Sequence, residues 1–325
     1  GDFPVFLHPD TGDEYALARR ETKVGPGYHG FSVDVGMDVT LEEDLARRDL
    51  TINAMALDHN GNLIDPYHGQ EDLNEGLLRH VSSAFIEDPV RLLRIARFAA
   101  KLGRWGFRVA HGTQGLIRKM AKSDDLMNLR KERVWKEMRT ALQEQQPWRF
   151  FEVLHKCGAL QRLLPELSAS LGTLGSHTGI TPSGPLDALR RAAADNAGLE
   201  IRYAVLMLNN QQTGLPVDKA CADLLSLARR LRDDYLQLGT ASANQLLTFV
   251  ERGGKGGQER LRALLAVYAY AWPEHAELAL RRVSMAQQAA ESVIAREMMR
   301  EGFQGAALGK ALRERKLQKI QQALG

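Results

Sequence analysis

Hydrophobic and polar positions divide the chain into a short stretch with strand periodicity and a long stretch with helical periodicity. Residues 3–7 and 14–19 are apolar runs on either side of the turn signal Pro9-Asp10-Thr11-Gly12-Asp13, which is typical of a β-hairpin. From residue 146 onward, apolar residues recur at helical spacing over most of the chain. The pattern therefore predicts an α+β protein with its strands near the beginning of the chain.

Two short helices are expected between the hairpin and residue 80. Thr40-Leu41-Glu42-Glu43 has the order of a capping box, so we expect a helix that begins after Thr40. Ile64-Asp65-Pro66 ends a strand in a turn. A second short helix is then expected from Asp72 to near Arg79.

The most distinctive stretch is the helix expected over residues 87–100. Glu87, Asp88 and Pro89 suit its first turn, where negative charge and proline are both favourable. Arginines then recur in steps of three, which keeps them on one slowly turning face. The other faces are apolar, so we expect the helix to be mostly buried. The arginines of this face are Arg91, Arg94 and Arg97.

Guanidinium groups on a buried helix need partners, because removing a charge from water without compensation is costly. A triphosphate and a base edge would both suit arginine, whose planar fork donates to phosphates and to base acceptors. The alternative is that these arginines lie at the surface and bridge to Glu and Asp side chains of neighbouring helices. The spacing alone favours neither interpretation.

Composition places the chain among ordinary globular proteins. It has 325 residues, enough for two or three modest domains, and is 44% hydrophobic and 26% charged. No apolar run reaches the length of about 18 residues that a membrane span requires, so no membrane partner is expected. The net charge of +3 permits nucleic-acid binding without requiring it. The two cysteines, Cys157 and Cys221, argue against a disulfide scaffold or a cysteine metal site and fit a reducing, cytoplasmic compartment.

The stretch Glu87-Asp88-Pro89-x-Arg91-x-x-Arg94-x-x-Arg97-Phe98-x-Ala100 resembles the nucleotide-selecting motif of the class II, bacterial-type tRNA nucleotidyltransferases. These are the CCA-adding enzymes and their poly(A) polymerase relatives. Other stretches resemble further motifs of this family and occur in the family's order, so the resemblance covers essentially the whole chain. They are Arg47-Arg48-Asp49-Leu50-Thr51-Ile52-Asn53-Ala54, in which Leu50 replaces the family's Phe, then Asp65-Pro66 with Gly69 and Asp72-Leu73, and Glu132-Arg133 with Glu137.

The resemblance implies template-independent addition of C and A nucleotides, from CTP and ATP, to the 3′ end of tRNA. Asp88 and Arg91 would present hydrogen bonds to the edge of the incoming base, because a wrong base would leave buried polar groups unpaired. Phosphates would be neutralised by Arg48, Arg94 and Arg97. A poly(A) polymerase of the same superfamily and a non-catalytic RNA-binding remnant are the alternatives.

The same resemblance implies that Asp49 and Asn53 hold the ribose or position Arg48. Support for the arginine side chains would come from Glu132, Arg133 and Glu137. Without the resemblance, these residues have simpler interpretations. Arg48 and Asp49 would form an ion pair while Asn53 caps a neighbouring backbone, and residues 128–142 would be a charged amphipathic helix.

Two-metal nucleotidyl transfer needs paired carboxylates that hold ions such as Mg²⁺. The family supplies them as Asp-x-Asp, shortly after a Gly-Gly-x-Val-Arg-Asp loop, and neither motif occurs at a suitable place in this sequence. We therefore expect the Mg²⁺ ligands upstream of Gly1, in a longer protein of which this chain is a part; a lost catalytic centre is the alternative. Glu14 is a candidate third carboxylate near the metal ions, or simply an exposed glutamate of a strand.

Three parts are expected along the chain. Residues 1–81 would form an incomplete nucleotidyltransferase head, a polymerase-β-like mixed sheet with helices. Residues 82–165 would form a helical neck, and residues 166–325 a helical body and tail that bind tRNA. A linker rich in Ser, Gly, Thr and Pro is expected over residues 169–185. The resemblance implies no particular oligomeric state.

The last third lacks the phosphohydrolase motif that many members of this family carry after such a linker. Leu208-Asn209 stands where their His-Asp pair would be, and neither side chain replaces a metal ligand of that kind, so we expect helices without hydrolase activity. Near the end of the chain, basic residues recur in steps of three. This spacing predicts a helix face that either tracks RNA phosphates or is simply solvated. The basic residues are Lys310, Arg313, Lys316 and Lys319.

Overall fold

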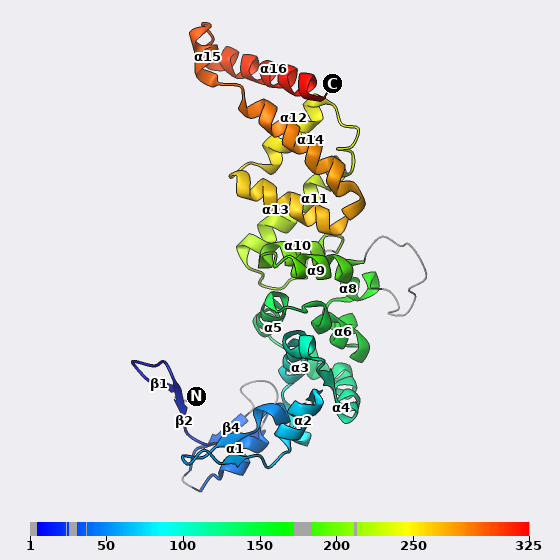
Figure 1. Ribbon diagram of the computed structural model, residues 1–325. Helices are drawn as coiled ribbons and strands as arrows, with labels where there is room; N and C mark the ends of the chain where they lie inside the picture. The colour runs from blue at the N-terminus through cyan, green and yellow to red at the C-terminus, as the bar shows by residue number, and fades with distance from the viewer. Residues whose placement is uncertain are drawn as a thin grey trace. The chain divides into compact units, whose positions relative to one another are not determined.

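The computed structural model describes residues 5–23, 25, 31–36, 38–171, 184–210 and 213–324. Most of the linker expected over residues 169–185 lies outside these residues. The chain divides into two compact units (Figure 1). Unit 1 is Gly1–Ala169 with Thr213–Pro216, and unit 2 is Ser170–Gln212 with Val217–Gly325. The expected head, neck and body boundaries at residues 81 and 165 stay predictions.

The strands of unit 1 are short and pair two by two. The predicted hairpin is present, because β1 (Val5–Leu7) and β2 (Glu14–Ala16) are antiparallel with Val5 opposite Ala16. Two further antiparallel pairs and one parallel pair follow along the chain. They are β3 (Arg20–Lys23) with β4 (Phe31–Asp34), β5 (Ala56–Leu57) with β6 (Leu63–Ile64), and the parallel β7 (Leu77–Leu78) with β8 (Arg108–Val109).

The α+β class is confirmed, but the strands are arranged differently from the prediction. We expected one mixed sheet, whereas the described strands form separate two-stranded ladders. Strands of two to four residues offer few ladder hydrogen bonds and little side-chain area, so they cannot build a core by themselves. The core of unit 1 is instead helical.

Helix α3 (Val90–Leu102) is the centre of unit 1. The other helices and 3-10 turns up to the boundary between the units are α1 (Leu41–Ala46), η1 (Thr51–Asn53), α2 (Gly69–Glu75), η2 (Ser83–Glu87), η3 (Gly103–Trp105), α4 (His111–Lys122), η4 (Asp124–Leu126), α5 (Lys131–Gln143), α6 (Trp148–Cys157), α7 (Ala159–Leu163) and α8 (Pro165–Ser170). Helix α3 packs against α5 and α6. Seven of its thirteen residues are buried, so the prediction of a mostly buried helix is confirmed.

The capping box of α1 is confirmed, whereas the bounds predicted for α2 were wrong. Thr40 Oγ1 accepts a hydrogen bond from Glu43 N, and the Glu43 carboxylate accepts one from Thr40 N. Helix α2 begins at Gly69 because both carboxylate oxygens of Asp65 accept backbone N–H groups of its first turn, at 2.7 and 2.9 Å. It ends before Gly76, which adopts a left-handed conformation (φ 67°) and turns the chain into β7.

Unit 2 contains helices and no strands among its described residues. The helices are α9 (Pro185–Ala194), α10 (Leu199–Met207), α11 (Lys219–Leu236), α12 (Ala243–Gly253), α13 (Gln258–Ala271), α14 (Pro273–Glu291), α15 (Ala295–Arg300) and α16 (Gly305–Leu324). Each packs on near neighbours in the chain, for example α10 on α11 and α12 on α14. The buried rings of Tyr235 and Tyr268 stack with their centroids 4.3 Å apart. Within the described ranges, none of the helices combines the length and apolar character of a bilayer-spanning segment.

The end of α10 is where the sequence lacks a His-Asp pair. Leu208 is buried there and Asn209 is exposed. The guanidinium of Arg229 donates to the carbonyl oxygens of Met207 and Leu208, at 2.8 and 3.4 Å, and also to that of Asn210. An arginine of α11 therefore satisfies carbonyl groups that the end of a helix leaves without partners.

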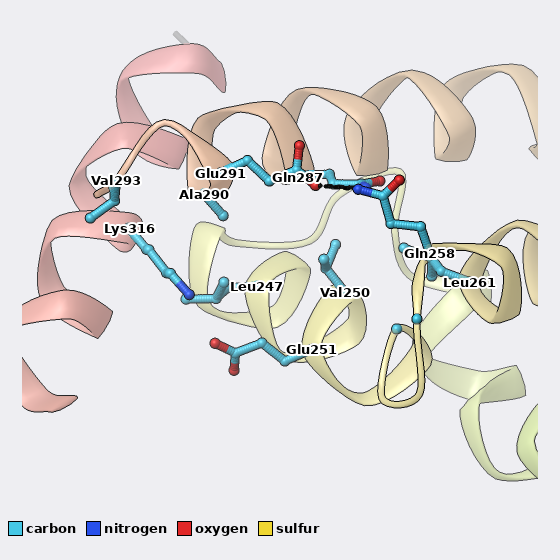
Figure 2. Close-up of a pocket in the computed structure, with 12 residues that line it drawn as sticks. Leu247, Val250, Glu251, Gln258, Leu261, Gln287, Ala290, Glu291, Val293 and Lys316 are labelled. Carbon is cyan, nitrogen blue, oxygen red and sulfur yellow. Dashed lines mark hydrogen bonds between the residues drawn. The ribbon is translucent and has the colours of Figure 1, made fainter. Parts of the chain in front are cut away.

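The basic face predicted near the end of the chain is only partly open to solvent. Arg313 of α16 turns toward α12 and donates to Glu251 (2.7 Å), Asn244 (2.9 Å) and Thr248 (3.2 Å). Lys316 lines a pocket of about 430 Å³ within unit 2 (Figure 2). Two of the four basic residues therefore turn toward their own unit, and RNA binding by this face stays a prediction.

The pocket lined by Lys316 lies among α12, α13, α14 and α16. Leu247 and Leu261 contribute to its apolar wall. At its rim, the side-chain amides of Gln258 and Gln287 donate to Glu291, at 3.1 and 3.0 Å (Figure 2). None of the site residues expected from the sequence lines this pocket.

Gly69 allows α2 to pack directly on η1. A Cβ atom at Gly69 would lie 2.3 Å from the carbonyl oxygen of Thr51 and 2.8 Å from Cγ of Met55. Glycine is the residue that permits so close an approach of two backbones. The contact joins the motif around residues 65–73 to the motif at residues 47–54.

Gly69→Ala is expected to lower the free energy of unfolding by about 1–3 kcal/mol, because the added methyl group forces α2 away from the Thr51 carbonyl. Gly115→Ala is the matched control in α4, where a Cβ atom meets open space. This control is expected to raise the free energy of unfolding by about 0.5–1 kcal/mol, because alanine is the better helix former. Urea unfolding followed by circular dichroism measures both. Two variants of equal stability would contradict the close approach.

Candidate functional site

Arg94 and Asp49 form the central ion pair of the site. Arg94 Nε donates to Asp49 Oδ2 at 2.6 Å, which joins α3 to the stretch between α1 and η1. The other oxygen of Asp49 accepts from Asn53 Nδ2 (3.1 Å) and from the backbone N–H of Leu50 (3.0 Å). Burial opposes ionisation of Asp49, but the charge and hydrogen bond of Arg94 outweigh it and lower the pKa of this carboxyl group.

Arg48 lies beside this pair and is more open to solvent. Its side chain is 42% exposed and donates to the carbonyl oxygen of Asn53 (3.2 Å) and to Asp44 Oδ2 (3.3 Å). Asp44 is buried and also accepts from Arg47 Nε at 3.0 Å. Burial opposes ionisation of Asp44, but the pKa of this carboxyl group is lowered because Arg47 and Arg48 surround it. Two guanidinium groups thus share one carboxylate.

Arg91 reaches from α3 to two backbone carbonyl groups. Its Nη2 donates to the carbonyl oxygen of Arg47 at 2.6 Å, and its Nη1 to that of Ala84 at 3.3 Å. Arg47 directly precedes Arg48, so Arg91 and Arg94 hold the same stretch of chain at two points. Backbone carbonyls are neutral acceptors, so these hydrogen bonds leave the positive charge of Arg91 without a balancing negative charge.

Helix α5 supports the other arginine and the acidic residue at the start of α3. Arg97 Nε donates to Glu137 Oε2 at 2.6 Å, and both side chains are largely buried. Arg133 Nη2 donates to Asp88 Oδ2 at 3.1 Å, while Asp88 Oδ1 accepts from the backbone N–H of Val90. Asp88 thus closes the first turn of α3 and is held in place by α5.

We call this set of side chains the arginine network. It consists of Asp44, Arg47, Arg48, Asp49, Asn53, Asp88, Arg91, Arg94, Arg97, Arg133 and Glu137. Two expected site residues are not part of it. Glu14 is exposed on β2 opposite Leu7, and Glu132 is exposed at the start of α5. Among the described residues, neither makes a side-chain hydrogen bond or an ion pair to the network.

Two family descriptions match parts of this chain. They are "Poly A polymerase head domain" over residues 10–79 and "Probable RNA and SrmB- binding site of polymerase A" over residues 106–171. A CCA-adding enzyme of Pseudomonas entomophila (strain L48) is 42% identical over 98% of this chain and 87% of that protein. A CCA-adding enzyme of Marinobacter nauticus is 40% identical over 99% of this chain and 87% of that protein. The chain belongs to the CCA-adding enzyme family.

Solved structures of CCA-adding enzymes share the fold of this chain. The apo form II of one such enzyme has a TM-score of 0.69 at 21% identity and covers 98% of this chain and 78% of that chain. The Thermotoga maritima CCA-adding enzyme complexed with tRNA has a TM-score of 0.63 at 18% identity and covers 99% of this chain and 82% of that chain. The CCA-adding enzyme fold thus extends over nearly all of this chain.

In this CCA-adding enzyme fold, a second cluster of side chains also holds the stretch around residues 48–53. Thr51 Oγ1 donates to the buried Asp72 at 2.6 Å, and Arg79 Nε donates to both oxygens of the same carboxylate at 2.9 Å. None of these side chains was predicted from the sequence to belong to the site. Asp72 and Thr51 each lie in a motif that carries the family resemblance, and this could have indicated a contact between the two motifs.

Asp44 and Arg47 were also missed as members of the site. Asp44 precedes Arg47 and Arg48 by three and four residues, the spacings at which helical side chains meet. Helix α1 ends at Ala46, so the arginines fold back onto the last turn of α1. This spacing was a readable signal that Asp44 would bind both arginines.

The described residues do not fit a metal centre. Nowhere in them do three or more His, Cys, Asp or Glu side chains gather as ligands for a metal ion. The carboxylates of the arginine network are each bonded to arginine, which competes with a cation for the same oxygens. We therefore assign no residue of this chain to Mg²⁺ and derive no reaction step through an ion.

Asp49→Asn is expected to lower the free energy of unfolding at pH 7 by about 1–3 kcal/mol, because Arg94 loses its charged partner in a partly buried setting. A carboxyl group with a lowered folded pKa contributes stability above its unfolded pKa of about 3.9 and loses it as pH falls through the folded value. The gap between wild type and variant should therefore narrow below about pH 4. Urea unfolding of both proteins at pH 7 and at pH 3 measures this difference in the free energy of unfolding.

Asp124→Asn is the matched control for this experiment. The Asp124 side chain is 95% exposed and pairs with Arg162 at the surface. Its removal is expected to change stability by less than about 0.5 kcal/mol. If Asp49→Asn were equally mild at pH 7, the central role given to the Arg94–Asp49 pair would be wrong.

Proposed function

We propose that this protein adds C and A nucleotides to the 3′ end of tRNA, using CTP and ATP and no nucleic-acid template. Membership of the CCA-adding enzyme family carries this proposal. The names of the relatives state CCA addition, and solved structures of CCA-adding enzymes include complexes with CTP, ATP and tRNA. The arginine network supports it, because it joins the two motifs that the resemblance links to nucleotide binding.

Asp88 and Arg91 select the base. Cytosine and adenine both present a ring-nitrogen acceptor beside an amino donor, whereas uracil and guanine present an N–H donor beside a carbonyl group. An arginine donor next to a carboxylate acceptor therefore matches C and A and mismatches U and G. Arg133 supports this role by donating to both oxygens of Asp88, at 3.4 and 3.1 Å, which orients the carboxylate. When the base binds, Arg91 gives up part of its hydrogen bonding to the carbonyl groups of Arg47 and Ala84 and donates to the base instead.

Arg48 and Arg94 bind the triphosphate. Arg48 is 42% exposed and shares its carboxylate partner, Asp44, with Arg47. Arg94 donates only its Nε to Asp49, and its Nη groups make no hydrogen bond to the described residues. Arg97 donates its Nε to Glu137 and is 15% exposed, so it holds α3 on α5 and is less accessible to phosphate than Arg48.

Asn53 contacts the ribose and Asp49 positions the groups around it. Both oxygens of Asp49 are occupied, by Arg94 on one side and by Asn53 and Leu50 on the other. The side-chain oxygen of Asn53 accepts nothing from the described residues and is available to a ribose hydroxyl group. The carbonyl oxygen of Asn53 holds Arg48, so one residue places both the sugar and the phosphate ligand.

A poly(A) polymerase activity is the second candidate, because one matching family description names a poly A polymerase head. Either activity acts on RNA in the cytoplasm. Cys157 and Cys221 are buried and form no disulfide bond within the described part of the chain, and a reducing compartment maintains such thiols. A non-catalytic RNA-binding role is the third candidate and predicts tRNA binding with no incorporation.

Incorporation assays separate these candidates. The full-length protein, which includes the segment expected to carry the Mg²⁺ ligands, is incubated in Mg²⁺ with tRNA that lacks CCA and with tRNA ending in C or in CC. Each tRNA is tested with CTP alone, ATP alone or both. CCA addition predicts that CTP extends the first two substrates and ATP extends only the third. Long A tails on every substrate would identify a poly(A) polymerase instead. tRNA binding without extension would leave only the non-catalytic role.

Arg91→Ala is expected to reduce the preference for the correct nucleotide at each step by about tenfold or more, because one donor to the base edge is lost. Single-nucleotide incorporation with CTP, ATP, UTP and GTP in competition measures this preference. Arg118→Ala is the control, since Arg118 is an exposed arginine of α4 outside the network. An Arg91→Ala enzyme with unchanged selection would refute the role given to Arg91.

A further inference from the structure

Trp105 is an exposed aromatic side chain at the end of the central helix of unit 1. It lies on η3, directly after α3, and is 57% exposed. Cζ of Arg104 lies 3.7 Å from the centroid of its ring, so a guanidinium plane covers one face of the indole. A single exposed apolar residue needs no explanation, but an exposed indole with a stacked arginine is an unusual surface.

Three basic residues lie within four positions of Trp105 in the sequence, and a fourth contacts the 3-10 turn that carries it. Lys101, Arg104 and Arg108 are exposed and Arg149 is half-buried. Within the described ranges, none of these four forms an ion pair with a carboxylate. Their hydrogen bonds go to neutral acceptors, such as the side chain of Gln145 for Arg104 (2.9 Å) and the carbonyl of Gly103 for Arg149 (3.1 Å).

This pattern contrasts with the arginine network, whose ion pairs compensate charge inside the protein. Arg94, Arg97 and Arg133 each meet a carboxylate within 3.1 Å. Around Trp105, by contrast, the described residues supply no carboxylate partner for the positive charges. An external anion is therefore the partner that this surface fits.

The surface around Trp105 is held in a fixed shape. Gly106 follows in a left-handed conformation (φ 84°), and the N–H of Arg108 donates to the carbonyl of Gly76 at 2.9 Å. On the other side, a Cβ atom at Gly103 would lie 2.4 Å from Cδ of Arg149, so η3 packs closely on that side chain. A preformed surface loses little entropy when it binds a ligand.

We propose that Lys101, Arg104, Trp105, Arg108 and Arg149 form a platform for RNA, on which an unpaired nucleobase stacks while the basic groups hold the adjoining phosphates. Aromatic rings and arginine planes stack bases, and unpaired lysine and arginine charges meet the backbone. The inference rests on the proposed function in taking tRNA as the RNA. Arg108 and Arg149 lie within the segment 106–171, which matches the RNA-binding family description, and the other three residues lie just before it.

The platform lies at the opposite end of α3 from Asp88 and Arg91. Fourteen residues separate Arg91 from Trp105, which corresponds to roughly 20 Å along a helix. The platform therefore binds a part of the RNA other than the nucleotide being added. It contributes to RNA affinity and leaves base selection to the other end of the helix.

The test measures binding of fluorescently labelled tRNA lacking CCA by anisotropy. Trp105→Ala is expected to weaken binding at least about fivefold, whereas Trp105→Phe keeps most of the affinity because phenylalanine still stacks. Lys101→Ala and Arg108→Ala are each expected to lower the slope of log affinity against log salt by about 0.7, the loss of one phosphate contact. Tyr15→Ala is the matched control, because Tyr15 is an aromatic residue of the same unit with 59% exposure.

Unchanged affinity in Trp105→Ala would overturn the platform, as would an equal loss in Tyr15→Ala. Circular dichroism melts of each variant separate a loss of binding from a loss of folding. Incorporation assays on the same variants of the full-length protein distinguish failure of the platform proposal from failure of the proposed function. Wild-type protein that extends tRNA while Trp105→Ala binds normally would refute the platform alone. Wild-type protein that binds tRNA through Trp105 without extending it would refute CCA addition and support the platform.

Discussion

The ion pair between Arg94 and Asp49 determines the shape of the candidate site. Arg94 belongs to α3, the helix around which unit 1 is packed, while Asp49 belongs to an irregular stretch between α1 and η1. An isolated antiparallel bridge between Leu50 and His80 fixes part of its backbone. The rest of its geometry depends on side-chain bonds. Asp49 supplies them by accepting from Arg94, Asn53 and its own neighbour at the same time. The position of Arg48 follows from the position of Asp49.

The charges of the network are distributed unevenly between the side toward α5 and the side toward α1. Toward α5, each arginine meets a carboxylate of its own, as Arg97 meets Glu137. Toward α1, Arg47 and Arg48 share Asp44, and Arg91 is bonded to neutral carbonyl groups. Within the network, the positive charge that lacks a carboxylate of its own is therefore that of Arg48 and Arg91. The proposed triphosphate site lies on that side, and the paired side keeps the helix in place.

Local sequence patterns predicted the elements of the site but not the bonds between them. The steps of three at Arg91, Arg94 and Arg97 gave a buried helix with one basic face, and they showed that partners were needed. They could not name those partners, because Asp49 and Glu137 are 45 and 40 residues away from the arginines they bind. Bridging to acidic side chains is confirmed for Arg94 and Arg97, and contact of the arginines with a triphosphate and a base edge stays a prediction.

The errors of the sequence analysis have physical causes of the same kind. The start of α2 was placed too late because the residue that caps it, Asp65, lies four residues before Gly69 and was assigned to a turn. The tail face was treated as open because spacing along α16 shows which side chains align, but not that Arg313 docks on α12. The expected mixed sheet required long-range strand pairing, which short apolar runs do not specify. The residue-level roles within the site stay predictions.

The exposure of Trp105 gives the molecule a built-in optical reporter. Of the other tryptophans, Trp135 is buried, and Trp148 and Trp272 are half-buried. A neutral collisional quencher in the solvent therefore meets the indole of Trp105 more often than the other three. Changes in the quenchable part of the intrinsic emission report on the end of α3 without a dye or a label. The side chain proposed to stack on RNA is thus also the one whose fluorescence is most open to quenching.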